Sequence, residues 1–223
     1  MFGRIATRYD LANRVLSGGI DIYWRFRLVR AVKKQAPLEI LDLATGSGDV
    51  AFKLHSELPQ AQHIVGMDFC APMLAEADAK KNASPGAYPR LVFRLGDALN
   101  LPLADASVDA VTLAFGIRNT ADRARCLSEI RRVLRPGGGL YILEFSQPWA
   151  WVRPFYLLHL NHVAPRLAGW LTGDKGAYLY LGDSINRFPG KEALAKELRD
   201  AGFSRVSATR MTFGVVALHC GFR

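Results

Sequence analysis

Cysteine is scarce in this sequence, and the cysteines that are there lie far apart. Cys70, Cys126 and Cys220 are the three among 223 residues, and none belongs to a C-x-x-C pair. Small disulfide-built domains and cysteine zinc sites need more numerous or more closely spaced thiols, so we exclude both and expect reduced cysteines. His159 and His162 lie three residues apart, but no carboxylate stands at ligand spacing beside them. We therefore expect no metal site.

A long, unbroken apolar run is also missing. The first ten residues contain Arg4, Arg8 and Asp10, where a secretory signal would need an apolar core, so no export signal is expected. The most apolar later stretch, 149–171, is interrupted by arginine, histidine and asparagine. It does not match a membrane span of about 20 apolar residues. We therefore expect a cytoplasmic protein.

Positive charge is in excess, with a formal net charge of +9 at pH 7. Such an excess serves solubility in most proteins and binds nucleic acid or anionic lipid in others. It is concentrated in 24–34 and 123–135, which we interpret as amphipathic helices with solvated basic faces. The apolar stripe of the second segment is Ala124, Leu127, Ile130 and Leu134. No base-stacking platform is interleaved with these charges, so we expect no nucleic-acid partner.

Short apolar runs alternate with amphipathic segments through the first two thirds of the chain. Strands are predicted at 38–44, 63–67, 91–95, 110–115 and 140–145. Helices are predicted at 49–58, 71–81 and 120–134, the last ended by Arg-Pro-Gly-Gly-Gly at 135–139. This alternation indicates an α/β fold, in which a mostly parallel sheet carries helices on both faces.

The C-terminal part adds three more predicted elements. They are a helix at 191–200 and two strands at 205–210 and 214–219, which are close enough to pair as antiparallel strands at the sheet edge. No internal repeat or low-complexity tract divides the chain. We therefore expect one domain over 1–223.

The loop after the first predicted strand has the composition of a nucleotide-binding turn. In LDLATGSGDVA, Gly46, Gly48 and Ala51 fit G-x-G-x-x-A. Asp68 lies twenty residues after Gly48, at the end of the second strand. Glycines let a ligand approach the backbone, and such an acid accepts hydrogen bonds from ribose hydroxyls. Asp97, just after the third strand, is placed to accept from an adenine amino group. A tight turn alone needs the same glycines, and an NAD oxidoreductase remains an alternative.

These positions resemble class I S-adenosylmethionine-dependent methyltransferases. The resemblance covers Asp42 with its glycine loop, Asp68, and the pair Asp97–Ala98. It implies a Rossmann-like fold with a mostly parallel seven-stranded sheet and an antiparallel C-terminal strand. The cofactor-binding residues that it implies are Asp42, Thr45, Gly46, Ser47, Gly48, Asp68, Phe69, Asp97, Ala98 and Ala114.

Three blocks narrow the resemblance to the ubiquinone/menaquinone biosynthesis C-methyltransferase family. They are YDLANRVLSGGIDIYW at 9–24, FGIRN at 115–119 and RVLRPGGGLYILEFS at 132–146, and the stretch from 178 onward is also similar. The chain departs from the family pattern at Ala12, where methionine is usual, at Asp21, where histidine is usual, and at Arg135, where lysine is usual. Asp21 is the largest change, because it reverses the sign of the charge.

The resemblance implies methyl transfer from S-adenosylmethionine to a ring carbon of a prenylated quinol. The ring carbon becomes nucleophilic as the neighbouring phenol loses its proton, and phenols titrate near 10 when tyrosine is the guide. We expect Arg118 to stabilise the phenolate, because arginine stays protonated, and Asn119 to hold a water or a quinol oxygen. A bound water, Tyr9 or Asp10 remain alternatives for the base.

Two segments are expected to face the substrate: 1–36 as a helical lid and 147–190 as a helical insertion. The aromatics Trp149, Trp151, Phe155 and Tyr156 are interleaved with cations, which suits either packing or a peripheral contact with a membrane. The alternatives left open are a methyltransferase of another phenol or lipid and a nucleic-acid-binding protein. The sequence says nothing about the oligomeric state, the ring type or the prenyl length.

Overall fold

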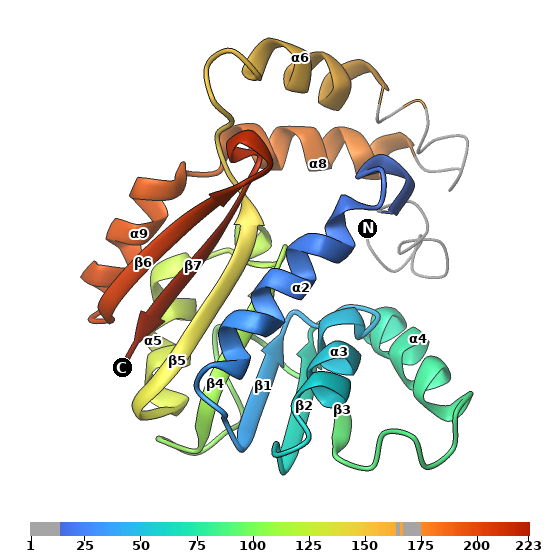
Figure 1. Ribbon diagram of the computed structural model, residues 1–223, viewed down its shortest axis with the longest axis vertical. Coiled ribbons are helices and arrows are strands. Elements are labelled where there is room, and N and C mark those ends of the chain that lie inside the picture. Colours follow the sequence, from blue (N-terminus) through green and yellow to red (C-terminus); the bar gives the residue numbers. More distant parts are fainter. Residues whose placement is uncertain (1–13, 164–165, 167–174) are drawn as a thin grey trace.

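Seven strands form one sheet through the centre of the protein, in the order β3-β2-β1-β4-β5-β7-β6 (Figure 1). The computed structural model describes residues 14–163, 166 and 175–223. The strands are β1 (Glu39–Leu43), β2 (His63–Asp68), β3 (Leu91–Leu95), β4 (Val108–Ala114), β5 (Leu134–Phe145), β6 (Ser204–Met211) and β7 (Val216–Phe222). Strands β1 to β5 pair in parallel, whereas β7 is antiparallel to both β5 and β6. The predicted fold class is confirmed.

Helices cover both faces of this sheet. They are α2 (Ile20–Lys33), α3 (Asp49–Glu57), α4 (Ala71–Asn82), α5 (Arg123–Val133), α6 (Arg153–Leu158), α8 (Lys175–Arg187) and α9 (Lys191–Asp200). Short helical turns are η2 (Ile117–Asn119), η3 (His159–Val163) and η4 (Thr212–Gly214). One buried cluster joins α2 and α3 to the sheet, and the other joins α5 and α9 to its opposite face. The apolar strand runs arise because both faces are buried.

Strand β1 shows how the sequence fits this arrangement. Ile40 packs in the cluster with α2 and α3, whereas Leu41 and Leu43 pack in the cluster with α5 and α9. Successive side chains of a strand point to opposite faces, so a strand at the centre of the sheet must be apolar on both. Asp42 is the polar exception inside β1, and it is fully buried. A buried carboxylate in such a strand indicates a functional position.

The predicted antiparallel pairing of the two C-terminal strands is confirmed. Strand β6 lies at the edge of the sheet, and β7 lies between β5 and β6. Strand β5 begins at Leu134, six residues before the predicted start at Leu140. The glycines allow this, since a Cβ on Gly138 would lie 3.0 Å from the backbone oxygen of Asp109. The backbone of this segment therefore packs closely enough to continue the strand.

The stripe predicted for α5 is right in its centre and wrong at its start. Leu127 and Ile130 are fully buried, but Ala124 is exposed, and Cys126 and Val133 contribute to the core instead. The helix begins at Arg123, three residues after the predicted start, with the Asp122 carboxylate accepting from the backbone N–H of Arg125. Ala124 therefore lies in the first turn of the helix, beside the N-cap.

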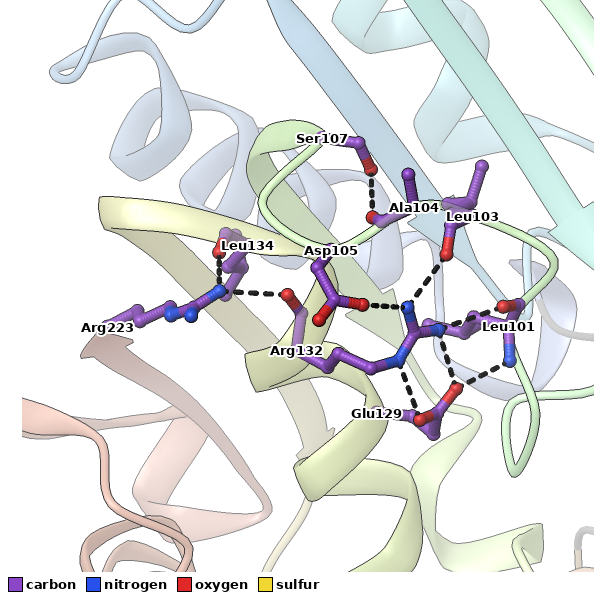
Figure 2. A network of polar contacts seen from close by, with 9 residues as sticks. All are labelled: Leu101, Leu103, Ala104, Asp105, Ser107, Glu129, Arg132, Leu134 and Arg223. Carbon is purple, nitrogen blue, oxygen red and sulfur yellow. Dashed lines mark hydrogen bonds and ion pairs between the residues drawn. The ribbon is translucent and has the colours of Figure 1, made fainter.

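The basic residues of α5 form only part of the solvated face that we expected, because Arg125 and Arg131 are exposed but Arg123 and Arg132 are half-buried. Arg132 donates through all three guanidinium nitrogens to Glu129, Asp105 and the backbone oxygens of Leu101 and Leu103, at 2.7 to 3.0 Å (Figure 2). These bonds tie the loop between β3 and β4 to α5. Arg223 donates to the backbone oxygen of Arg132 and so joins the C-terminus to the same helix. Much of this positive charge therefore stabilises the fold.

Helices α6 and α8 belong to the predicted insertion 147–190. They lie beyond the end of the sheet at which the parallel strands finish (Figure 1). Helix α8 contacts η2, the turn formed by the FGIRN segment. Ile185 in α8 and Leu160 in η3 are buried there. Helix α2, which belongs to the predicted lid 1–36, packs against β4, β5 and α3 through Trp24 and Leu28. Within the described residues, no helix is both long and apolar enough to cross a membrane.

Candidate functional site

A cleft opens at the carboxyl ends of β1, β2 and β4, where open α/β sheets bind their ligands. The space between its walls is about 740 Å³, including the solvent at its open mouth. The residues that line it are Arg25, Asp42, Ala44, Thr45, Gly46, Ser47, Asp49, Val50, Asp68, Phe69, Cys70, Met73, Ala114, Phe115, Gly116 and Asn119.

The floor of the cleft is built around the buried carboxylate of Asp42. The parallel register places Asp42 beside Thr112 of β4, and the Thr112 hydroxyl donates to Oδ1 at 2.6 Å. The hydroxyl of Thr45 donates to Oδ2, also at 2.6 Å. Burial raises the pKa of Asp42 to about 6, although the two hydroxyls and Arg25 oppose this rise. Asp42 therefore changes its charge close to neutral pH.

The turn after β1 needs glycine for two reasons: its backbone is left-handed, and neighbouring side chains leave no room for a Cβ atom. Gly46 and Gly48 have φ values of +56° and +88°, which are left-handed. A Cβ on Gly48 would lie 2.7 Å from Cζ of Phe93, so a larger residue would also collide. Gly48 ends the turn as the N-cap of α3. The turn thus brings backbone against the cleft, as a ligand with a ribose and a short polar chain requires.

Asp68 holds the same turn from the second strand. Its Oδ2 accepts from the backbone N–H of Gly46 at 2.8 Å, and its Oδ1 accepts from the N–H of Cys70 at 2.9 Å. Burial raises the pKa of Asp68, and the bonds from Cys70 and Gly46 partly offset this. A carboxylate has about four acceptor positions, and the N–H groups of Gly46, Phe69 and Cys70 use three of them. One position remains for a hydroxyl of a ligand, which fits a ribose.

The FGIRN segment forms the opposite wall. Phe115 has a left-handed φ of +57°, and Ala44, at the end of the neighbouring strand β1, has +53°, so two non-glycine residues are strained at this point. Gly116 presses on the end of β1, since a Cβ there would lie 2.5 Å from Cβ of Ala44. The turn η2 then carries Asn119 into the cleft lining.

Arg118 points away from the cleft lining. Its Nη1 donates to Oε1 of Glu144 at 2.9 Å, and the two side chains are 2% and 0% exposed. Burial raises the pKa of Glu144, and the Arg118 guanidinium works against that rise. Among the described residues no partner accepts from Arg118 Nε, and the buried hydroxyls of Tyr156 and Ser146 are likewise without one. The segment therefore leaves unpaired polar atoms behind the wall of the cleft.

Arg25 of α2 is the cation that the sequence analysis missed. It lines the cleft, and its guanidinium lies 5.7 Å from the ring centre of Phe115. Its Nη1 donates to Oδ2 of Asp21, one turn earlier on the helix. We expected a solvated basic face here, but the side chain of Arg25 is only 14% exposed. The helix begins at Ile20, four residues before the predicted start, and this brings Asp21 and Arg25 onto one face.

The structure brings most of the predicted cofactor residues together. The cleft is lined by Asp42, Thr45, Gly46, Ser47, Asp68, Phe69 and Ala114, with Gly48 directly behind. Asp97 and Ala98 do not line it. Asp97 is exposed and accepts from the backbone N–H of Leu99 at 2.9 Å. Tyr9 and Asp10 lie outside the described residues.

Other residues that line the cleft were not predicted either, and for most of them no feature of the sequence points to a ligand site. Met73 resembled an ordinary core residue, because its place at the cleft depends on where α4 begins. Phe115 belongs to the FGIRN block but was not assigned to the site. Asp49 was visible as an acid directly after the glycine turn, in the first turn of α3. Arg25 was visible four residues after Asp21 in the block at 9–24. That i, i+4 pairing was the available signal.

The chain is similar over its whole length to known methyltransferases. The model of the ubiE/COQ5 methyltransferase family matches residues 1–223. A demethylmenaquinone methyltransferase of Thermus thermophilus is 48% identical, with 100% of both chains covered. The ubiquinone/menaquinone biosynthesis C-methyltransferase of Rubrivivax gelatinosus is 41% identical, covering 100% of this chain and 85% of its own. A solved SAM-dependent methyltransferase of Aquifex aeolicus shares the fold with a TM-score of 0.63, at 19% identity over 87% of this chain and 88% of that one.

Proposed function

The chain belongs to the ubiE/COQ5 methyltransferase family, and from this premise we propose that it methylates a ring carbon of a prenylated quinol in menaquinone or ubiquinone biosynthesis. Family membership makes it an S-adenosylmethionine-dependent methyltransferase and removes the NAD oxidoreductase alternative. The observation that carries the proposal is the FGIRN turn, which brings Asn119 to the cofactor cleft with Arg118 directly behind it.

The residues of the cleft fit S-adenosylmethionine. Asp68 has an acceptor position for a ribose hydroxyl, and the exposed ring of Phe69 with Met73 offers a surface for the adenine. Asp42 and the turn at Gly46 offer negative charge and close backbone approach at the other side. The cofactor supplies an electrophilic methyl group on a sulfonium sulfur. We propose that Asp97 and Ala98, which do not line the cleft, border the adenine from the end of β3.

The protein has to make a phenol ring nucleophilic beside this cleft. We propose that Asn119 contacts the ring oxygen and that Arg118 stabilises the negative charge that develops there. The Arg118 guanidinium is held by Glu144 behind the wall of the cleft, so it would act on the ring oxygen through its charge and not by direct contact. The hydroxyl proton leaves to a water held by these groups, or to Tyr9 or Asp10, and the ring-carbon proton is lost after the methyl group has bonded to that carbon. Fixed donors in a water-poor site give this stabilisation its strength.

We propose that 1–36 and 147–190 cover the substrate side of the single domain 1–223. Helix α8 contacts η2, so a part of the insertion already lies against the FGIRN turn. The buried side chains of Leu160, Ile185 and Phe188 make this region apolar. An apolar path beside the cleft is what a prenyl tail requires.

A peripheral contact with the membrane would deliver this tail, and an exposed group of aromatics supports it. This aromatic patch consists of Trp149, Trp151 and Phe213, which are 44%, 62% and 54% exposed and have ring centres 5.5 to 6.2 Å apart. Exposed aromatic clusters with nearby cations are typical of bilayer interfaces. In a flotation assay with anionic vesicles, the wild type should be found in the vesicle fraction and the Trp151→Ser variant should not. Absence of the wild type from the vesicle fraction would remove the membrane contact.

The function is tested by methyl transfer from labelled S-adenosylmethionine to short-tailed demethylmenaquinol and to a methoxylated benzoquinol, each with and without reductant. We expect product with one or both reduced quinols and none without reductant. Asn119→Ala should lower kcat at least tenfold while binding S-adenosylhomocysteine within threefold of the wild type. A protein that binds the cofactor but methylates neither quinol would contradict the proposal and favour another phenol or lipid.

A further inference from the structure

The cleft contains three acids and, within the described part of the chain, a single cationic side chain. Asp42, Asp49 and Asp68 supply the negative charge and Arg25 the positive charge. S-adenosylmethionine carries two positive groups, the sulfonium and the ammonium, and one negative group, its carboxylate. Asp68 is assigned to the ribose, and Asp49 also pairs with Lys80 at 3.3 Å. Among the lining side chains, Arg25 is therefore the one whose charge suits the carboxylate of the cofactor.

The guanidinium of Arg25 is fixed in place from three sides. Asp21 accepts from Nη1 on the side away from the cleft. Asp49 lies 3.9 Å from Nη2, at the limit of an ion pair, and the Phe115 ring lies under the guanidinium. Arginine has five N–H donors in a planar fork. Among the described residues only Asp21 accepts a hydrogen bond from Arg25, so several donors remain for a ligand.

Asp21 is in turn held rigidly. Its side chain is 6% exposed, and its Oδ1 accepts from the hydroxyl of Ser17 at 2.9 Å. Both carboxylate oxygens are thus used within α2 and the turn before it. The family pattern has histidine at this position, and an imidazole, which carries no negative charge, could not neutralise the guanidinium. The change at Asp21 therefore acts on Arg25, and the sequence difference has a structural consequence at the cleft.

We propose that Arg25 binds the carboxylate of the amino-acid end of S-adenosylmethionine and that Asp21 is the positioning residue that aims it. This rests on the cofactor that the family uses and not on the quinol. Arginine is suited to the task, because its fork matches the two oxygens of a carboxylate. The lining position and low exposure of Arg25 strengthen the bond, since water competes less in a partly buried site.

The experiment compares two ligands that differ in the carboxylate alone. Isothermal titration measures the Kd of S-adenosylmethionine and of decarboxylated S-adenosylmethionine in the absence of quinol. Arg25→Gln should weaken the first about 10- to 100-fold and the second less than threefold. Arg25→Lys should recover part of the loss, since it restores the charge without the fork. Because no methyl acceptor is present, the result is independent of the quinol proposal.

A matched variant and the positioning residue complete the design. Arg27→Gln makes the same change on the same helix, where the guanidinium donates to the Tyr23 hydroxyl outside the cleft, and should alter neither Kd. Asp21→Asn should weaken S-adenosylmethionine about 3- to 10-fold with little change for the decarboxylated ligand, and Asp21→Glu should recover part of it. If Arg25→Gln leaves the ratio of the two Kd values unchanged, the proposal is overturned, whether or not both ligands bind more weakly.

Discussion

Two arginines flank the same pair of aromatic rings and make a natural comparison. Phe115 and Phe145 have ring centres 5.0 Å apart. Arg25 lies 5.7 Å from the centre of Phe115, and Arg118 lies 5.3 Å from that of Phe145. Both guanidinium groups also bond to a carboxylate. The two regions therefore share their local chemistry.

Exposure separates these regions. The side chain of Arg25 is 14% exposed and lines the cleft, whereas Arg118 is 2% exposed and its partner Glu144 is fully buried. Removing one member of a buried ion pair strongly destabilises the fold, because the other charge is left buried without a partner or solvent. Arg118 thus has a structural role that must be separated from any catalytic one, whereas Arg25 is available for a ligand.

The largest expected effect is on stability, from breaking the buried pair. Arg118→Ala or Glu144→Gln should lower the free energy of unfolding by about 3 to 5 kcal/mol, because each leaves one polar group buried alone. Urea unfolding followed by circular dichroism measures the loss. Arg25→Gln, at the more exposed pair, should cost less than half as much. Equal losses of stability at the two sites would contradict the claim that burial distinguishes the Arg118 pair from the Arg25 pair.

A double variant separates the two roles of Arg118. Arg118→Met combined with Glu144→Leu removes both charges and should regain most of the stability lost by either single change. Methyl transfer should stay low in this variant if Arg118 stabilises the phenolate. Recovery of full activity together with stability would show that the pair is structural only.

The second effect concerns pH, through the buried acid near Arg25. The pKa of Asp42 is about 6 instead of its ordinary 3.8, so the folded protein holds this proton more tightly than the unfolded chain. Its contribution to stability is complete below about pH 4 and is lost as pH rises through 6, a change of about 3 kcal/mol. The difference in unfolding free energy between wild type and Asp42→Asn, measured from pH 4 to 7.5, isolates it.

Arg25 sharpens this prediction, because its charge lowers the pKa of Asp42. In Arg25→Gln the loss of stability should extend to higher pH than in the wild type. The Arg118 region offers the control, since Arg118 is not among the groups that shift Asp42. A pH profile that Arg25→Gln leaves unchanged would mean that the cleft screens the two groups from each other.

A smaller effect is expected at the turn that joins the two regions. Gly116→Ala would place its Cβ 2.5 Å from Cβ of Ala44 and 3.1 Å from Cδ2 of Leu113. The collision should cost about 1 to 3 kcal/mol and weaken cofactor binding, because η2 must move away from β1. Gly190→Ala is the matched control, since its Cβ would make ordinary 3.6 Å contacts. Thermal unfolding and cofactor titration measure the two consequences.

The smallest effect is expected behind the rings. The indole of Trp24 contacts both Phe115 and Phe145, and its N–H donates to the hydroxyl of Thr212 at 2.8 Å. Thr212→Val keeps the shape and removes the acceptor, so stability should fall by about 1 kcal/mol. Chemical unfolding measures it. If the loss exceeded that of Gly116→Ala, the ranking of the contacts around these rings would be wrong.

Strand and helix identities were predictable, because both rest on local periodicity. The runs at 91–95 and 191–200 match β3 and α9 residue for residue. The start of β5 was missed and the place of β7 between β5 and β6 was not predicted, because both depend on hydrogen bonds between strands that are distant in sequence. In the cleft, Gly46 and Asp68 were predicted from spacing, since the first two strands end at neighbouring places in a parallel sheet, and Asp42 was predicted from the family resemblance.

The sequence by itself determined the fold class, the family and the glycine turn with its two acids, because these follow from composition, periodicity and motifs that lie within short stretches. Only the tertiary structure decided which arginine meets the cleft. Arg25 and Arg118 are both basic residues near aromatic ones, and nothing local distinguishes a guanidinium that faces a ligand from one that is closed off. That distinction arises where α2 packs over β4 and where Glu144 of β5 lies beneath the FGIRN turn, since packing fixes exposure and exposure fixes what a charge can bind.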